Sequence, residues 1–185
     1  MNPLLTSRLA LREFTDQDLP WIHAYASDPF TTQYMSWGPN TLEETQNFLG
    51  HCLSSQRTEP RTDYEWAITL SSGESIGGCG IGITNISARQ GYLGYILARQ
   101  YWGQGYGTEA ARAVVEFGFI HLRLHRIWAD CDVDNRASVH ILEKVGMSRE
   151  GRLRHHRWKG GSWRDSFVYA ILEEEWEAKS KGNVG

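Results

Sequence analysis

The most informative part of the chain reads Tyr101-Trp-Gly-Gln-Gly-Tyr-Gly-Thr-Glu-Ala110. It lies between a predicted strand and a predicted helix, and its three alternating glycines permit positive φ angles and close approach of a ligand to the backbone. The free N–H groups of such a turn, together with the partial positive charge at the start of the next helix, suit an anion. A diphosphate is the natural ligand, and a simple tight turn is the alternative.

Two other phosphate-binding turns do not match this stretch. A P-loop requires Gly-Lys followed by Ser or Thr, and the chain contains no such sequence. A dinucleotide-binding turn has the spacing G-x-G-x-x-G, whereas the spacing here is G-x-G-x-G, and its ribose-binding acid, expected about 20 residues further on, has no clear candidate in a following strand. The pattern therefore favours a diphosphate ligand of another class.

The flanking sequence predicts one α+β domain with a mixed sheet. Alternating apolar and polar residues indicate about seven strands, near 8–14, 64–70, 76–83, 91–97, 126–133, 148–158 and 163–172. Helical spacing and capping residues indicate about four helices, one between Thr15 and Pro29, one after Thr41, and two near 108–120 and 136–145. No linker or repeat divides residues 1–175, and residues 176–185 are predicted to be a polar tail.

The composition gives no sign of several other kinds of site or partner. The net charge of −3 over 185 residues, without a basic stripe, gives no reason to expect nucleic-acid binding. Three widely spaced cysteines predict neither a disulfide framework nor a zinc site. His121 and His125 are four residues apart, but no third ligand is evident, so no metal is expected. No apolar run is long enough for a membrane span, and a cytoplasmic location is expected.

The turn and its surroundings resemble the GNAT superfamily of acyl-CoA-dependent N-acetyltransferases. The family has an [Arg/Gln]-x-x-Gly-x-[Gly/Ala] turn after its fourth strand, and Trp is frequent at the first position in its RimJ/RimL type, which acts on ribosomal proteins. Further signatures follow in the same order and extend the resemblance to about residues 4–172. They are Ser7-Arg-Leu-Ala-Leu-Arg12, Glu65-Trp-Ala-Ile68, Ile76-Gly-Gly78, Asn135-Arg-Ala-Ser138 and Leu142-Glu-Lys-Val-Gly-Met147.

The resemblance implies a mostly antiparallel sheet that splays between its fourth and fifth strands and binds acetyl-CoA there. The pantetheine arm pairs with the backbone of Tyr95, Ile96 and Leu97. The pyrophosphate is expected on backbone amides of Trp102, Gly103, Gln104, Gly105, Tyr106, Gly107 and Thr108. Asn135 contacts the pantetheine arm, although a helix N-cap explains this residue equally well. Ser138 is expected near the sulfur as a donor to the departing thiolate, and Lys144 near the adenine or a phosphate.

The implied mechanism is direct attack of a neutral amine on the thioester within a ternary complex. Alkylammonium groups have pKa values near 10, so a proton acceptor is needed. Some Rim-type enzymes use a glutamate on the strand after the short helix, but the comparable stretch, Leu153-Arg-His-His-Arg-Trp158, contains no carboxylate. Five candidates therefore stay open: Glu65, Asp130, Asp132, His155 and His156.

The acceptor is open as well. The resemblance favours the N-terminal amine of a protein or peptide, and the alternative enzyme is an acetyltransferase of a small amine such as an antibiotic or polyamine. A third hypothesis is a non-catalytic domain that senses acyl-CoA, because no base is obvious. Neither nucleic acid nor membrane is expected as a partner, and the protein is expected to be a monomer or homodimer.

Overall fold

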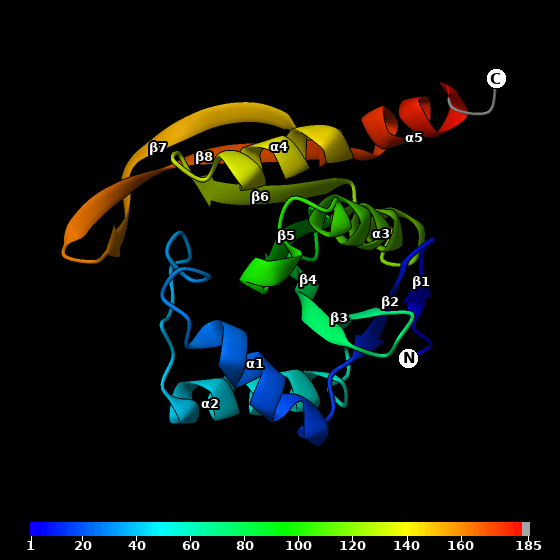
Figure 1. The fold of residues 1–185 in the computed structure, drawn as a ribbon. Helices are drawn as coiled ribbons and strands as arrows, with labels where there is room; N and C mark the ends of the chain where they lie inside the picture. Colours follow the sequence, from blue (N-terminus) through cyan, green and yellow to red (C-terminus); the bar gives the residue numbers. More distant parts are fainter. Residues whose placement is uncertain (183–185) are drawn as a thin grey trace.

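The computed structural model describes residues 1–182 and shows one eight-stranded sheet with helices on both faces (Figure 1). The sheet order is β1-β2-β3-β4-β5-β6-β8-β7. The strands are β1 (Leu4–Leu5), β2 (Leu9–Glu13), β3 (Asp63–Leu70), β4 (Ser75–Asn85), β5 (Gln90–Leu97), β6 (Arg126–Asp132), β7 (Ser148–Lys159) and β8 (Ser162–Leu172). The helices are α1 (Leu19–Ala26), α2 (Leu42–Ser55), α3 (Tyr106–Ile120), α4 (Arg136–Val145) and α5 (Glu173–Gly182), with 3-10 turns at Asp16–Asp18 and Arg99–Tyr101.

The sheet is antiparallel except between β5 and β6, and this pair holds together over a short distance only. Gln90, Gly91 and Tyr92 pair with Arg126, Ile127 and Trp128, and no pairing follows beyond them. The remaining halves of both strands diverge, so the backbone of 93–97 faces open space on the β6 side. This confirms the splay that the resemblance implied.

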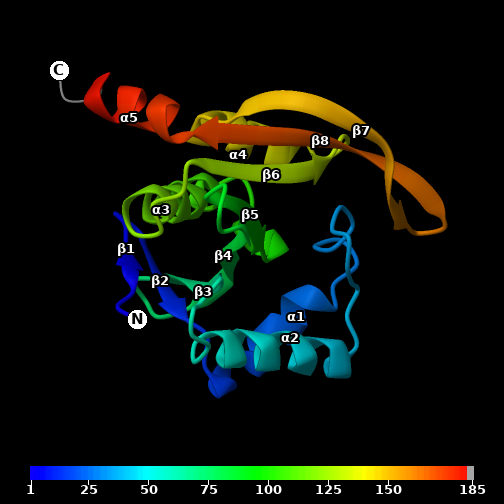
Figure 2. The same ribbon diagram turned by 180° about the vertical axis from the view of Figure 1, so that it is seen from behind.

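The helices cover the two faces of the sheet differently (Figures 1 and 2). Helices α1 and α2 pack on one face through a small core that includes Phe14, Ile22, Leu49 and Ala67. Helices α3 and α4 cover the other face, where the main core gathers around Trp66, a residue with 0% exposure. Successive residues of β3 therefore point to opposite faces, and Glu65 points toward the α1–α2 side.

The predicted elements are confirmed with small shifts at their ends, and α3 begins at Tyr106 rather than near Thr108. The capping box at Thr41 and Glu44 is present, and Gly146 ends α4 at φ 103°. Strand β1 was not expected, because two residues show no periodicity. Helix α5 was not expected, and it runs from Glu173 through the first part of the predicted polar tail to Gly182. Trp176 stacks on Phe119 at 5.3 Å, and Lys179 Nζ donates to the Gly146 carbonyl at 2.7 Å. Residues 183–185 lie outside the described part.

A buried ion pair fixes the start of α1. Arg12 donates two hydrogen bonds to the Asp18 carboxylate, at 2.7 and 2.8 Å, and the Thr15 amide and the Trp21 indole N–H also donate to it. Burial alone would raise the pKa of Asp18, but these donors outweigh it and hold the pKa below its ordinary value.

Asp18→Ala should lower the free energy of unfolding by about 3 kcal/mol at neutral pH, because it leaves the charge of Arg12 without a carboxylate and two N–H groups without an acceptor. The folded pKa is lower than the unfolded one, so the difference from wild type is full above roughly pH 4 and shrinks as the pH falls through the folded pKa. Urea unfolding at pH 7 and pH 3 measures both, with the exposed Asp16→Ala as the matched control. An equal loss at the two pH values would contradict the ion-pair explanation.

Candidate active site

The glycine-rich turn presents a row of free backbone N–H groups to a cavity. Gly103 and Gly105 adopt φ angles of 73° and 85°, and Gly105 is the N-cap of α3. None of the amides from Gly103 to Thr108 donates to an acceptor within residues 1–182. The first amides of a helix have no partner in the helix itself, and they carry its positive partial charge. The arrangement therefore fits a diphosphate.

The turn is fixed from the N-terminal segment. The Glu109 carboxylate, in the first turn of α3, accepts hydrogen bonds from Thr6, Ser7 and Arg8. Arg8 donates in turn to the Gln104 carbonyl at 3.0 Å, and its guanidinium lies over the Tyr106 ring. Arg8 was not among the predicted site residues. Its contacts are about a hundred positions away in sequence, so no local pattern could indicate them.

The cavity beside this turn, here called the turn cavity, has a volume of about 650 Å³. The structure brings together at its wall nearly all of the residues predicted for acetyl-CoA: Tyr95, Ile96, Leu97, Trp102, Gly103, Gly105, Tyr106, Gly107, Thr108, Asn135, Ser138 and Lys144. Gln104 is the exception, because its side chain turns away and donates to the Gln100 carbonyl.

Helix α4 forms the opposite wall. Asn135 accepts a hydrogen bond from the Ser138 amide at 3.1 Å, so its role as N-cap is confirmed. Arg136, His140 and Lys144 follow at intervals of four, line the turn cavity, and pair with no carboxylate in the described chain. This basic row suits phosphate groups. Arg136 and His140 were missed, although the i, i+4 spacing from Lys144 could have indicated them.

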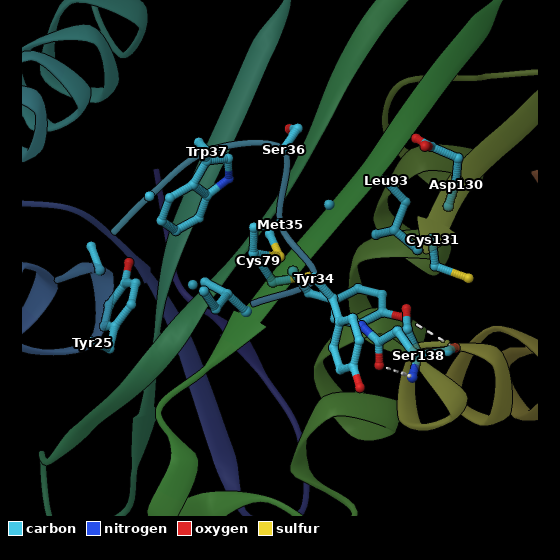
Figure 3. Close-up of a pocket in the computed structure, with 18 of the residues that line it drawn as sticks. Tyr25, Tyr34, Met35, Ser36, Trp37, Cys79, Leu93, Asp130, Cys131 and Ser138 are labelled. Atoms are coloured by element: carbon cyan, nitrogen blue, oxygen red, sulfur yellow. Dashed lines mark hydrogen bonds between the residues drawn. The ribbon is translucent and has the colours of Figure 1, made fainter. Parts of the chain in front are cut away.

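A second cavity, here called the sheet cavity, has a volume of about 600 Å³ and extends from the splay to α1 and α2. It shares six lining residues with the turn cavity, and two of them, Tyr95 and Ser138, mark the junction. Figure 3 shows Ser138 at this end of the sheet cavity. The Tyr95 hydroxyl and Ser138 Oγ lie 2.7 Å apart. Burial raises the pKa of Tyr95, so this phenol stays protonated and can hold the Ser138 hydroxyl in place.

Glu65 provides the free carboxylate of the sheet cavity. It is half-buried and makes no hydrogen bond or ion pair within residues 1–182. Its carboxylate lies over Gly80 on the neighbouring strand, where any Cβ atom would overlap it. Burial, and then the nearby charge of Asp63, raise the pKa of Glu65 to about 7. A carboxyl group with this pKa can accept and release a proton near neutral pH.

The other four candidates for the base are engaged elsewhere. Asp132 accepts two hydrogen bonds from Arg164. Asp130 lines the sheet cavity but forms an ion pair with Arg157. His155 stacks on Trp163, and His156 contacts Ser166 at 3.1 Å; neither lines the sheet cavity.

The described residues contain neither a metal-binding group nor a helix that could span a membrane. His121 packs against the Phe117 ring, and His125 lies 3.8 Å from Glu173. Within residues 1–182, no group of three His, Cys, Asp or Glu side chains could hold a metal ion. No described helix is long and apolar enough to cross a bilayer.

Comparison with known proteins identifies the family. Residues 8–148 match the family described as acetyltransferase (GNAT) domain. The chain belongs to the GNAT acetyltransferases. As a GNAT protein it is an N-acetyltransferase with acetyl-CoA as the donor, and the free amides and the basic row of the turn cavity fit that donor.

Similar acetyltransferases align with almost the whole chain. An uncharacterized N-acetyltransferase, YnaD from Bacillus subtilis, is 31% identical over 94% of this chain and 98% of its own length. The spermidine N(1)-acetyltransferase of Escherichia coli is 29% identical over 92% of this chain and 89% of its own length. The solved structure of RimL, a ribosomal L7/L12 alpha-N-protein acetyltransferase in complex with coenzyme A, superposes with a TM-score of 0.81. It covers 92% of this chain and 98% of its own, and at 21% identity this likeness establishes the fold alone.

Proposed function

We propose that this GNAT enzyme binds acetyl-CoA in the turn cavity and a primary amine in the sheet cavity, with Glu65 as the general base and Ser138 as the donor to the leaving thiolate. The observation that supports this most directly is the unpartnered Glu65 carboxylate, in a cavity that meets the turn cavity at Ser138. Acetyl-CoA supplies the activated acetyl group, and the residues of the chain orient it and move the protons.

The donor would be held mainly by the backbone. The amides of 103–108 and the basic row on α4 suit the phosphates, with Lys144 among them. The backbone of Tyr95, Ile96 and Leu97 is unpaired on the β6 side and suits the amides of the pantetheine arm. Asn135 would meet the same arm while it caps α4.

Proton movement is assigned to two side chains. An ammonium group must lose a proton before it can attack, and Glu65, with a pKa of about 7, can take it directly or through water. Ser138 lies at the junction of the cavities, where its hydroxyl can donate to the departing thiolate.

A covalent acetyl-cysteine route is disfavoured. Cys79 and Cys131 both line the sheet cavity, but a thiol must ionise to become a nucleophile. Burial raises the pKa of Cys131 to about 11 and that of Cys79 well above its ordinary value. Direct attack by the amine therefore remains the simplest route.

The β7–β8 hairpin contacts the loop that borders the sheet cavity, and this contact affects which acceptors can bind. Lys159, at the end of β7, donates to the backbone carbonyls of Trp37 and Gly38, and so ties the β7–β8 hairpin to the 34–39 loop. This contact, and the similarity to a spermidine acetyltransferase, favour a small amine. The protein N-terminus stays a prediction of the RimL-type resemblance.

Ser138→Ala should lower kcat by roughly 10- to 100-fold while the Kd for coenzyme A changes little, because the hydroxyl acts on the leaving group. Release of the coenzyme A thiol, measured with a panel of primary amines and checked by product mass, gives kcat, and calorimetry gives the Kd. Ser54→Ala, on the exposed side of α2, is the matched control. An equal loss of turnover and affinity would make Ser138 a binding residue, and no thiol release by the wild type with any amine would refute the proposed function.

A further inference from the structure

The sheet cavity has one polar end made of two side chains without partners. Tyr25, from α1, is 5% exposed, and its hydroxyl makes no hydrogen bond within residues 1–182. Glu65 lines the same cavity and is equally unpartnered. Neither oxygen is enclosed by protein, because Trp66 Nε1 is the one fully buried side-chain polar atom without a partner among the described residues, so both are open to a ligand in the cavity. A hydroxyl and a carboxylate together suit one ammonium or amine group.

The rest of the cavity offers no place for a second ammonium group. Glu44 also lines it, but its carboxylate accepts from the Thr41 amide at 2.7 Å in the capping box of α2. Asp130 is neutralised by Arg157, which itself lines the cavity. Glu65 is therefore the one carboxylate of this lining, within the described chain, that no group of the protein engages. A second positive charge in this space would lose its hydration without gaining a counter-charge.

The walls away from the polar end are apolar and largely aromatic. Trp37 lies on the same side of the cavity as the Tyr25 ring, with Met35 between it and the junction at Ser138 (Figure 3). Phe48 and Ile22 complete this part of the lining. Aromatic walls gain most from a flat apolar group that stacks on them and displaces water.

The 34–39 loop forms one side of the sheet cavity. It supplies Tyr34, Met35 and Trp37 to the lining, and Lys159 holds the main chain of this loop through two carbonyl groups. The ammonium of Lys159 also places a positive charge at this loop. The positive charge at this side of the cavity favours a molecule with one ammonium group over a long polycation.

We infer that the acceptor is a compact primary monoamine with a flat apolar body, of the arylalkylamine class. Its amine would lie beside Glu65, facing the acetyl group that enters the sheet cavity from the junction at Ser138, and its ring would lie against Trp37 and Phe48. This inference rests on the proposed function and adds the identity of the acceptor class to it. In the transfer, the nitrogen forms the new bond to the acetyl carbon as the carbon–sulfur bond breaks, and Glu65 takes the proton that the nitrogen loses.

The inference is tested by measuring kcat/KM for three amines and a peptide, each one separately and at saturating acetyl-CoA. The amines are 2-phenylethylamine, n-butylamine and spermidine, and the peptide is a short one with a free N-terminus. We expect kcat/KM for phenylethylamine to exceed that for butylamine by roughly 10- to 100-fold, as burial of an aromatic ring predicts, and to exceed that for spermidine and the peptide by at least as much. Calorimetry on coenzyme A-loaded protein should give the same order of affinities.

A variant locates the ring. Trp37→Ala should reduce kcat/KM for phenylethylamine several-fold and leave butylamine nearly unchanged, while Trp163→Ala, on the exposed hairpin, should change neither. Preference for spermidine or for the peptide, or an equal loss for both amines in Trp37→Ala, would overturn the inference and leave the proposed function intact. No turnover of any acceptor would overturn both.

Discussion

Gly105→Glu should abolish binding of coenzyme A and of acetyl-CoA. Gly105 has a φ of 85°, which only glycine adopts without strain, and its amide is one of the free donors facing the turn cavity. A glutamate here adds a negative charge where the phosphates are expected, and it offers Arg8 a competing partner, because a Cβ at this position lies 3.3 Å from the Arg8 guanidinium. Calorimetry should show at least a hundred-fold weaker binding.

A control must separate the backbone strain of replacing a glycine at positive φ from the loss of the coenzyme A site. Gly73 has the same φ of 85°, lies in the β3–β4 turn, and has open space around it. Gly73→Glu therefore carries the same backbone penalty and the same charge change without touching the turn cavity. Wild-type affinity in Gly73→Glu beside lost affinity in a folded Gly105→Glu supports the assignment. Unchanged affinity in Gly105→Glu would remove this turn from the donor site.

Glu65→Gln should lower kcat by roughly 10²- to 10⁴-fold while binding of coenzyme A is unchanged, because the amide keeps the shape of the side chain but cannot accept the proton. The wild-type rate should rise with pH through about 7, the pKa of Glu65, and the variant should lose this limb. The free energy of unfolding of the wild type should change with pH in the opposite direction to the rate. A carboxyl group whose folded pKa exceeds its unfolded value loses stability as pH rises between roughly 4 and 7, so the variant should be at least as stable as wild type at pH 8.

Gly80→Ala gives an independent route to the same result. Its added methyl group would overlap the Glu65 carboxylate, which is the far end of a flexible side chain and can move aside. The fold should be kept, while the carboxylate is displaced and kcat falls. Full activity in Glu65→Gln would identify a different base, and full activity in Gly80→Ala alone would show that the position of the carboxylate is not critical.

Much of the fold followed from local patterns. Capping residues such as Thr41 and Glu44 and the alternation within strands are set by neighbours in sequence, so they could be predicted. Helix α5 was missed because it depends on Trp176 and Lys179 reaching residues far along the chain. Strand β1 was missed because its two leucines are too few to show a period.

The candidate site divides in the same way. The turn from Trp102 to Thr108 is continuous in sequence, and all of its residues except Gln104 line one cavity. The special environment of Glu65 depends on Gly80, which lies opposite it on another strand, so the sequence could name the residue but not distinguish it from four others. The contact between Tyr95 and Ser138 joins residues 43 positions apart and needed the folded structure.

The short pairing between β5 and β6 gives this sheet an unsatisfied strand edge in its interior. Exposed edges of this kind recruit other chains and promote aggregation, and most proteins shield them at the rim. Here the free backbone lines the turn cavity, where the amide-bearing arm of coenzyme A would complete it by augmentation. The open strand edge can therefore form backbone hydrogen bonds with the bound donor, and while it does so it is not available for pairing with another chain.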